Sequence, residues 1–358
     1  MGKKMNKWWS QVRTVVGLEI RKTFFSRRGT WVYLLAFAPA LLWLVHSIDT
    51  MRDREHRRAL AVAHPVSSEA LHSAKRDMSR EEIESKLGEP YEKSVRVTRR
   101  GDELAFYRYT DGESDLTVFM LNGTVNNVSE QTRDSISKDS VIFATVFQFF
   151  YLRLAIFFGC VGIFTNLFRA EMLEKSLHFY LLSPIRREVL LVGKYLAGLI
   201  ATVTIFTTGT ALQLLALAWH FDPGALREYL QGPGWHHVAA YLGVTALACL
   251  GYGSVFLTAG MLFRNPIIPA VVVLQWEFIN IFLPGFLKKI SVIFYLQSLC
   301  PVVAPPDQDL PVPLRLLISS AEPVGAMAAI TGLSVVTLGV LVFAAMQARK
   351  LEINYSTD

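Results

Sequence analysis

The sequence predicts an α-helical polytopic membrane protein with six transmembrane helices, an N-terminal interfacial helix and a small α+β extracytoplasmic domain. Three observations lead to this fold class. Of the 358 residues, 52% are hydrophobic and only 18% are charged, whereas soluble domains carry about 25% charged residues. Six apolar stretches reach the length of about 20 residues that a helix needs to cross a bilayer. Residues 50–140, in contrast, have the composition of a soluble protein.

Residues 1–29 are predicted to form a cytoplasmic amphipathic helix at the membrane interface. Apolar side chains recur near helical spacing at Trp8, Val12, Val15, Ile20 and Phe24, with basic residues between them. This pattern is typical of a helix that lies in the plane of the interface. A simple cytoplasmic extension of the first span is the alternative.

Six transmembrane helices divide the rest of the chain. The predicted spans are Thr30–Ile48, Val141–Leu167, Leu190–Trp219, Val238–Phe263, Ile267–Phe286 and Val324–Met346. The first helix thus occupies residues 30–49, the external domain residues 50–140, the other five spans residues 141–348, and a cytoplasmic tail residues 349–358. Within 287–322, a short apolar run and several prolines predict a re-entrant or interfacial segment on the outer face, with a hydrophobic loop as the alternative.

Lysine and arginine residues in the short flanking segments set the orientation, because cytoplasmic loops are enriched in them. One side carries Lys3, Lys4, Lys7, Arg13, Arg21, Lys22, Arg27, Arg28, Arg169, Lys175, Arg186, Arg187, Lys194, Arg264, Arg349 and Lys350. The other side carries only Arg227, Lys288, Lys289 and Arg315. Both termini are therefore predicted to be cytoplasmic. The net charge of +6 reflects this topology, and no basic patch with interleaved aromatic residues predicts a nucleic-acid partner.

The cysteine pattern predicts neither disulfides nor a metal site. Cys160, Cys249 and Cys300 are far apart, and no Cys/His spacing matches a metal-binding motif. The basic start of the chain has no short apolar core followed by a cleavage site, so we expect no cleaved signal peptide.

The external region is predicted to be a short helix followed by an antiparallel meander. Ser79 and Glu82 form a capping box, and Gly88 ends the helix. The predicted strands are Ser94–Arg99, Leu104–Tyr109, Leu116–Leu121 and Thr124–Val128, separated by Gly-containing turn signals. This order resembles the small SmpA/BamE-type module of outer-membrane-assembly lipoproteins. The resemblance implies a protein-binding domain without catalytic residues, which recruits a periplasmic partner. A domain that merely caps the spans is the alternative.

The segment 169–183 is predicted to be a short amphipathic helix between the second and third spans, ended by Pro184. Such a helix either enters a groove on a cytoplasmic partner or is an ordinary interfacial loop. Its acidic-x-x-acidic-Lys-Ser-Leu sequence at 171–177, the Leu-Leu-Ser-Pro-Ile-Arg-Arg run at 181–187 and the Gly-Lys pair at 193–194 resemble the coupling region of ABC-2 type transporter permeases.

The resemblance implies a permease subunit of an ATP-binding-cassette exporter in the bacterial inner membrane, which moves an amphiphilic or lipid-linked substrate or a drug outward. In this family two permease subunits, identical or similar, pair with two ATPase subunits. The residues that would face the ATPase are Glu171, Glu174, Lys175, Ser176 and Leu177.

The sequence predicts no catalytic site in this chain. It contains no Gly-x-x-x-x-Gly-Lys-Ser/Thr phosphate loop, so ATP and magnesium are expected on the partner ATPase. An intramembrane protease is the enzyme alternative, but no His-Glu-x-x-His motif occurs, and Gly251, Gly253 and Ser254 are better explained as helix-packing positions. A non-transporting membrane anchor or sensor that presents the external domain to a periplasmic protein is the other alternative.

Two charged residues are predicted to lie near the middle of the membrane. Arg153 and Glu277 fall about 18 Å and 15 Å into spans that begin on opposite sides. A charge at this depth usually faces the bundle interior and finds a partner. We therefore expect the two side chains to pair, directly or through water, with Gln148, Gln275 and Asn280 as further hydrogen-bonding groups. The alternative is that both are solitary, with Arg153 reaching the interface and Glu277 protonated.

Overall fold

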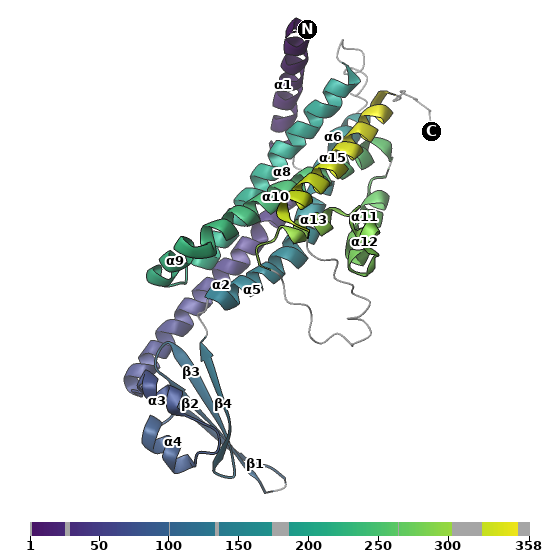
Figure 1. Cartoon of the computed structure of the whole chain (residues 1–358). Helices are drawn as coiled ribbons and strands as arrows, with labels where there is room; N and C mark the ends of the chain where they lie inside the picture. The colour runs from purple at the N-terminus through teal and green to yellow at the C-terminus, as the bar shows by residue number, and fades with distance from the viewer. Residues whose placement is uncertain are drawn as a thin grey trace. The chain divides into compact units, whose positions relative to one another are not determined.

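The computed structural model describes residues 2–25, 29–99, 101–132, 136–173, 186–263, 265–302 and 324–349 (Figure 1). These residues contain five helical stretches that are long and apolar enough to cross a membrane: Thr30–Ala63, Ile136–Arg169, Arg187–Ala218, Pro223–Leu262 and Ala326–Arg349. The chain divides into two compact units. The first comprises Met1–Leu42, Ser140–Ala216 and Arg227–Asp358, and the second Trp43–Asp139 and Leu217–Leu226.

The first two helices follow the predicted pattern with one correction. Helix α1 (Gly2–Phe25) buries Val12 and Val15 on one face, as its periodicity predicts. Helix α2 (Thr30–Ala63) does not end near Ile48 as predicted but continues through much of the polar sequence. It continues because neither glycine nor proline occurs between Pro39 and Pro65, and the residue before a proline is a favoured place for a helix to end.

The second predicted span is one continuous helical rod of three parts. Helix α5 (Ile136–Val146) leads into the π-helix η2 (Phe147–Ile156), which leads into α6 (Phe157–Leu173). A π-helix of ten residues is uncommon, because most occur as single-turn bulges, frequently at functional sites. The rod passes the predicted end at Leu167, so the predicted coupling helix at 169–183 begins as an extension of this span.

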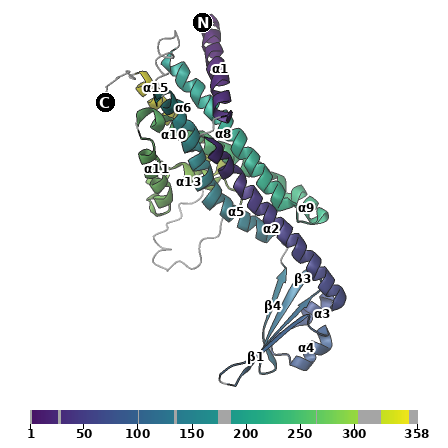
Figure 2. The same cartoon turned by 180° about the vertical axis from the view of Figure 1, so that it is seen from behind.

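The third and fourth spans lie mostly in the first unit. They are helix α8 (Arg187–Ala218) and the series α9 (Pro223–Tyr229), η3 (Leu230–Gly234) and α10 (Trp235–Leu262). Figure 2 shows α8 and α10 from behind. Helix α10 approaches α6 and α13 (Val292–Ser298) closely at glycines. A Cβ atom on Gly253 would lie 2.5 Å from the Phe164 ring, and one on Gly251 would lie 2.9 Å from Val292. The predicted packing role of these two glycines is thus confirmed.

The fifth predicted span, Ile267–Phe286, is not a single helix. Helix α11 ends at Ile279 after 13 residues and is followed by the 3₁₀ turn η4 (Asn280–Phe282). Leu283 is extended with ψ of 150°, because Pro284 disfavours a helical conformation in the residue before it. The short helices α12 (Gly285–Lys288) and α13 (Val292–Ser298) follow, and α15 (Ala326–Arg349) is the last helix. Of the predicted re-entrant segment 287–322, residues 303–322 lie outside the described residues.

The second unit contains the predicted α+β domain. Helices α3 (Ser68–Ser73) and α4 (Arg80–Leu87) precede a four-stranded antiparallel meander in the order β1 (Glu92–Val97), β2 (Glu103–Thr110), β3 (Ser114–Leu121) and β4 (Thr124–Thr132). The predicted capping box is present: Ser79 Oγ accepts from the Glu82 amide, and Glu82 accepts from the Ser79 amide. Helix α3 was not predicted.

One face of the meander packs against the two short helices. Alternate residues of β2 and β3 point to this face, together with side chains from α3 and α4, and the buried set is Leu71, Ile83, Leu87, Ala105, Tyr107, Tyr109, Leu116, Val118, Met120 and Val125. The tight turn between β3 and β4 uses Asn122 and Gly123, both with positive φ (51° and 83°). This confirms the Asn-Gly hairpin signal, because such turns need left-handed residues.

Candidate functional site

The first unit contains a buried ion pair where helices α1, α6 and α8 meet. Lys194 Nζ donates to Glu19 Oε1 over 2.9 Å and to the Leu167 carbonyl over 2.7 Å. The lysine side chain is fully buried, and the glutamate side chain is 5% exposed. The ammonium therefore joins three helices through two short hydrogen bonds. In the sequence, Lys194 was counted among the basic residues of the cytoplasmic side, and Glu19 was not recognised as its partner.

The α1–α8 contact around this pair is tight because a glycine allows it. A Cβ atom on Gly193 would lie 2.6 Å from Val15 Cγ1, so any larger residue would push α1 away. Val12, Val15 and Glu19 lie at i, i+3 and i+7 and therefore share one face of α1. The buried stripe on α1 is thus two valines and one ion-paired carboxylate.

The residues of this three-helix contact flank the predicted coupling segment in the sequence, with Leu167 before it and Lys194 after it. Helix α6 ends at Leu173 and α8 begins at Arg187. Of the predicted ATPase-facing residues, Glu171 belongs to the last turn of α6, while Glu174, Lys175, Ser176 and Leu177 lie outside the described residues. The start of α8 is also tied to the end of α15, because Arg349 Nε donates to Glu188 over 2.6 Å and Arg187 donates to the Arg349 carbonyl over 2.8 Å.

Arg153 and Glu277 lie in the same unit but form no direct ion pair, so the pairing of these residues through water stays a prediction. The Glu277 carboxylate accepts hydrogen bonds from Ser291 Oγ (2.6 Å) and from the amides of Val292 (3.1 Å) and Ile293 (3.0 Å). These are the first amides of α13, where the helix dipole stabilises a negative charge. Glu277 therefore fastens α11 to α13, and its hydrogen-bonding capacity is largely taken.

Arg153 has no such partner in the described part of the chain. Its Nε and Nη2 atoms are buried without a hydrogen bond, and the residue is only 2% exposed. The guanidinium instead lies over the rings of Phe149 and Phe278, with Cζ 5.0 Å and 5.9 Å from the ring centroids. Because Phe278 adjoins Glu277, the arginine lies close enough to α11 to interact electrostatically with the carboxylate, although no ion pair within 4.0 Å joins the two side chains. Of the predicted additional groups, Gln148 donates to the Val302 carbonyl and Asn280 to the Lys288 carbonyl.

Arg153 belongs to a set of buried polar side chains that lack hydrogen-bond partners among the described residues. The others in the first unit are Gln213, Tyr241, Tyr252, Trp276 and Thr337. Gln213 is fully buried, and neither its oxygen nor its nitrogen makes a hydrogen bond within 3.5 Å to a described residue. A buried polar atom without a partner costs about 1–3 kcal/mol, so these groups carry a stability cost that the hydrogen-bonded Lys194 and Glu277 avoid.

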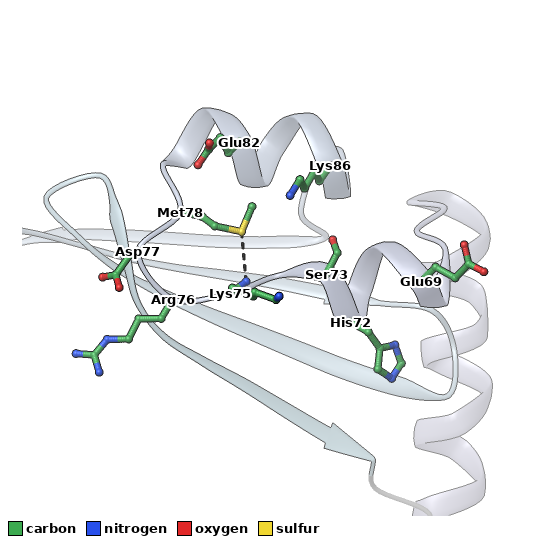
Figure 3. A pocket seen from close by; sticks show the side chains of 9 residues that line it. All are labelled: Glu69, His72, Ser73, Lys75, Arg76, Asp77, Met78, Glu82 and Lys86. Carbon is green, nitrogen blue, oxygen red and sulfur yellow. Dashed lines mark hydrogen bonds between the residues drawn. The ribbon is translucent and has the colours of Figure 1, made fainter.

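The second unit has an open polar hollow between α3 and α4 (Figure 3). Its volume is about 590 Å³, and its walls are Glu69, His72, Ser73, Lys75, Arg76, Asp77, Met78, Glu82 and Lys86. The Met78 sulfur accepts from the Lys75 amide over 3.3 Å, which shapes the segment between the helices. His72 has a raised pKa, because Nδ1 bonds the Ser68 carbonyl and the Glu130 carboxylate lies 3.2 Å from Nε2. The mixture of charges suits a polar partner.

No protein-family model matches the sequence, and no curated protein or solved structure matches the chain.

Proposed function

We propose that the chain is the transmembrane permease subunit of an ATP-binding-cassette exporter, which moves an amphiphilic substrate outward with the energy of a separate ATPase. In this proposal the chain pairs with a second permease subunit in the bacterial inner membrane, both its termini are cytoplasmic, and its sheet domain faces the periplasm. The sequence pattern at 171–187 and the five long apolar helices support this assignment.

The observation that carries the proposal is the set of unpaired polar side chains inside the bundle. Arg153, Gln213 and Tyr252 belong to η2, α8 and α10, and each has buried side-chain atoms that make no hydrogen bond within 3.5 Å to a described residue. In a membrane, such groups are costly and usually mark a substrate or ion pathway. A permease explains the cost, because the polar head of a passing substrate supplies the missing hydrogen bonds. The cation Arg153 favours an anionic head group.

A second observation supports coupling to a motor. The segment that the sequence pattern assigns to ATPase contact leads directly into α8, where Lys194 joins α1, α6 and α8. A displacement of this segment would move α1, α6 and α8 together, because the buried ion pair and the close contact at Gly193 restrict independent movement of these helices.

The test is co-purification of an ATPase with the full chain from native membranes. A tag on the sheet domain leaves the proposed cytoplasmic face unobstructed. We expect an ATPase with a phosphate loop in equal amount, and we expect the double reversal Glu171→Lys/Glu174→Lys to remove it. The matched control is Glu55→Lys/Glu89→Lys, two exposed reversals in the second unit, which should leave the ATPase bound.

The role of the unpaired polar groups is tested separately by ATP turnover of the purified complex. Arg153→Gln should leave assembly intact but reduce the extra turnover that lipid extract or candidate amphiphiles induce. Equal stimulation of the variant and the natural chain would contradict a substrate role for Arg153. If no ATPase accompanies the natural chain under gentle extraction, the permease proposal fails, and a non-transporting anchor that presents its sheet domain becomes the better explanation.

A further inference from the structure

Three metal-ligating side chains converge in the second unit, although they are far apart in the sequence. His46 lies on α2, Asp139 in the first turn of α5, and His220 between α8 and α9. One potential ligand atom from each lies within 4.8 Å of the other two. The sequence predicted no metal site, because none of its short Cys/His spacings matches a metal-binding motif. We propose that these residues bind a divalent transition-metal ion, with zinc as the best-fitting ion.

The distances are close to those that zinc requires. Zinc is bound at about 2.0–2.2 Å in a tetrahedral arrangement, which places ligand atoms about 3.3–3.5 Å apart. His220 Nε2 already lies 3.0 Å from Asp139 Oδ2. The His46 nitrogen needs to move by no more than about 1.5 Å, which a small rotation of a partly exposed side chain supplies. Two of the three ligands are therefore already positioned.

Ser47 provides the supporting contact that a metal-binding histidine needs. Its Oγ lies 3.1 Å from His220 Nδ1. Metal-binding histidines usually donate their second ring N–H to a neighbouring acceptor, which fixes the tautomer and the ring orientation. When Nε2 binds the ion, Nδ1 carries the proton and donates it to Ser47. A hydroxyl suits this place, because it can also donate to Nδ1 when the ion is absent.

Aromatic side chains contact both histidine rings and restrict their orientation. Trp43 meets the His46 ring edge-on with centroids 5.6 Å apart, and Phe221 packs on the His220 ring at 4.0 Å. The two imidazole rings lie nearly perpendicular to each other at 5.7 Å. Both imidazoles therefore enter the site with restricted orientations, which lowers the entropy lost when the ion binds.

The donor set selects the class of ion. Two imidazole nitrogens and one carboxylate suit zinc, cobalt, nickel or copper, whereas calcium and magnesium prefer oxygen ligands alone. Three protein ligands leave one position for water or another donor.

Ser47, His220 and Asp139 also have the connectivity of a Ser-His-Asp catalytic triad. The burial argues against catalysis, because Ser47 is only 1% exposed and offers no approach to a substrate carbonyl. A triad also gives no role to His46, whereas the metal site uses all three ligands. Bound zinc would fasten α2, the start of α5 and the Leu217–Leu226 segment within this unit.

The experiment uses the full chain, purified in detergent with a tag that contains no histidine and stripped with a chelator. Zinc is then titrated with removal of unbound ion, and cobalt is added separately because tetrahedral cobalt absorbs visible light. We expect about one zinc per chain and a higher melting temperature with zinc. His46→Gln and Asp139→Asn should each weaken zinc binding by at least about 100-fold.

The matched control is His56→Gln, an exposed histidine on the same helix as His46, which should bind zinc like the natural chain. His46→Gln keeps the test valid if Asp139→Asn fails to fold, because His46 is only partly buried. Binding of less than about 0.1 zinc per chain, or unchanged affinity in His46→Gln, overturns the proposal. Labelling of Ser47 by a fluorophosphonate in a zinc-free protein also overturns it and assigns hydrolase chemistry instead.

Discussion

Removal of the Lys194 ammonium should destabilise the helical bundle far more than removal of an exposed lysine. In Lys194→Met, the methionine fills a similar volume, but the Glu19 carboxylate stays buried. Its remaining cation is Lys22, whose Nζ lies 4.0 Å away on a side chain that is 59% exposed. The Leu167 carbonyl loses its hydrogen bond from Nζ as well.

The expected magnitude follows from this geometry. Breaking a buried ion pair by removing one partner costs about 3–5 kcal/mol, whereas replacing both partners by apolar residues is often neutral. Lys22 screens part of the stranded charge, so we expect about 3 kcal/mol for Lys194→Met. The double variant Glu19→Leu/Lys194→Met should lie within about 1 kcal/mol of the natural chain, which gives a coupling energy of about 2–4 kcal/mol.

Reversible unfolding in mixed detergent micelles, followed by tryptophan fluorescence, measures these free energies of unfolding. The matched control is Lys22→Met, which removes a mostly exposed cation from the same cluster and should change stability by less than about 0.5 kcal/mol. If Lys194→Met is as mild as Lys22→Met, or if the two single changes simply add in the double variant, the ion pair does not hold α1 to the bundle.

Three further predictions address packing, capping and pH. Gly260→Ala should lower the free energy of unfolding by about 1–3 kcal/mol, since its Cβ would lie 2.6 Å from the backbone of Thr165. Gly243→Ala on the same helix meets nothing within 4 Å, so the same unfolding assay should show it to be neutral or stabilising. Ser79→Ala removes the α4 cap and should cost about 1 kcal/mol, visible as faster hydrogen exchange in α4 but not in α3. Burial alone would raise the pKa of Asp111, but hydrogen bonds from the Ser114 and Glu113 amides outweigh it and lower the pKa below 3.8. The stabilisation by the Asp111 carboxylate is therefore full above about pH 4 and is lost as the pH falls through its lowered pKa. Hydrogen exchange in the β2–β3 turn of the natural chain should accelerate below that pKa. In Asp111→Asn it should be fast already at neutral pH.

Local signals predicted the sheet domain well. The capping box at Ser79 and the hairpin turn at Asn122-Gly123 each depend on residues close in sequence, and both occur as predicted. The long apolar helices were also predictable, because burial in a bilayer needs only length and apolar composition. The extension of α2 to Ala63 was missed, since residues from 50 onward were assigned to the external domain by their composition.

Contacts between distant segments could not be predicted in this way. Nothing near Lys194 in the sequence indicates that a glutamate 175 positions earlier would face it. The hydrogen bonds that Glu277 accepts could not be predicted either, because the amides at the start of α13 reach its carboxylate only after the chain breaks at Pro284. The ligand group around His220 likewise exists only after three chain segments have folded together.

The π-helix η2 has a mechanical consequence for the rod that it interrupts. Each π turn contains more residues than an α turn, so η2 holds spare chain inside a continuous helix. Tightening one such turn to α geometry would release one residue, which corresponds to a rotation of about 100° and a shift of about 1.5 Å along the axis. One end of the rod would turn like a screw relative to the other without any helix breaking. Arg153 lies inside η2, so the same step would carry its guanidinium from one side of the helix to the next.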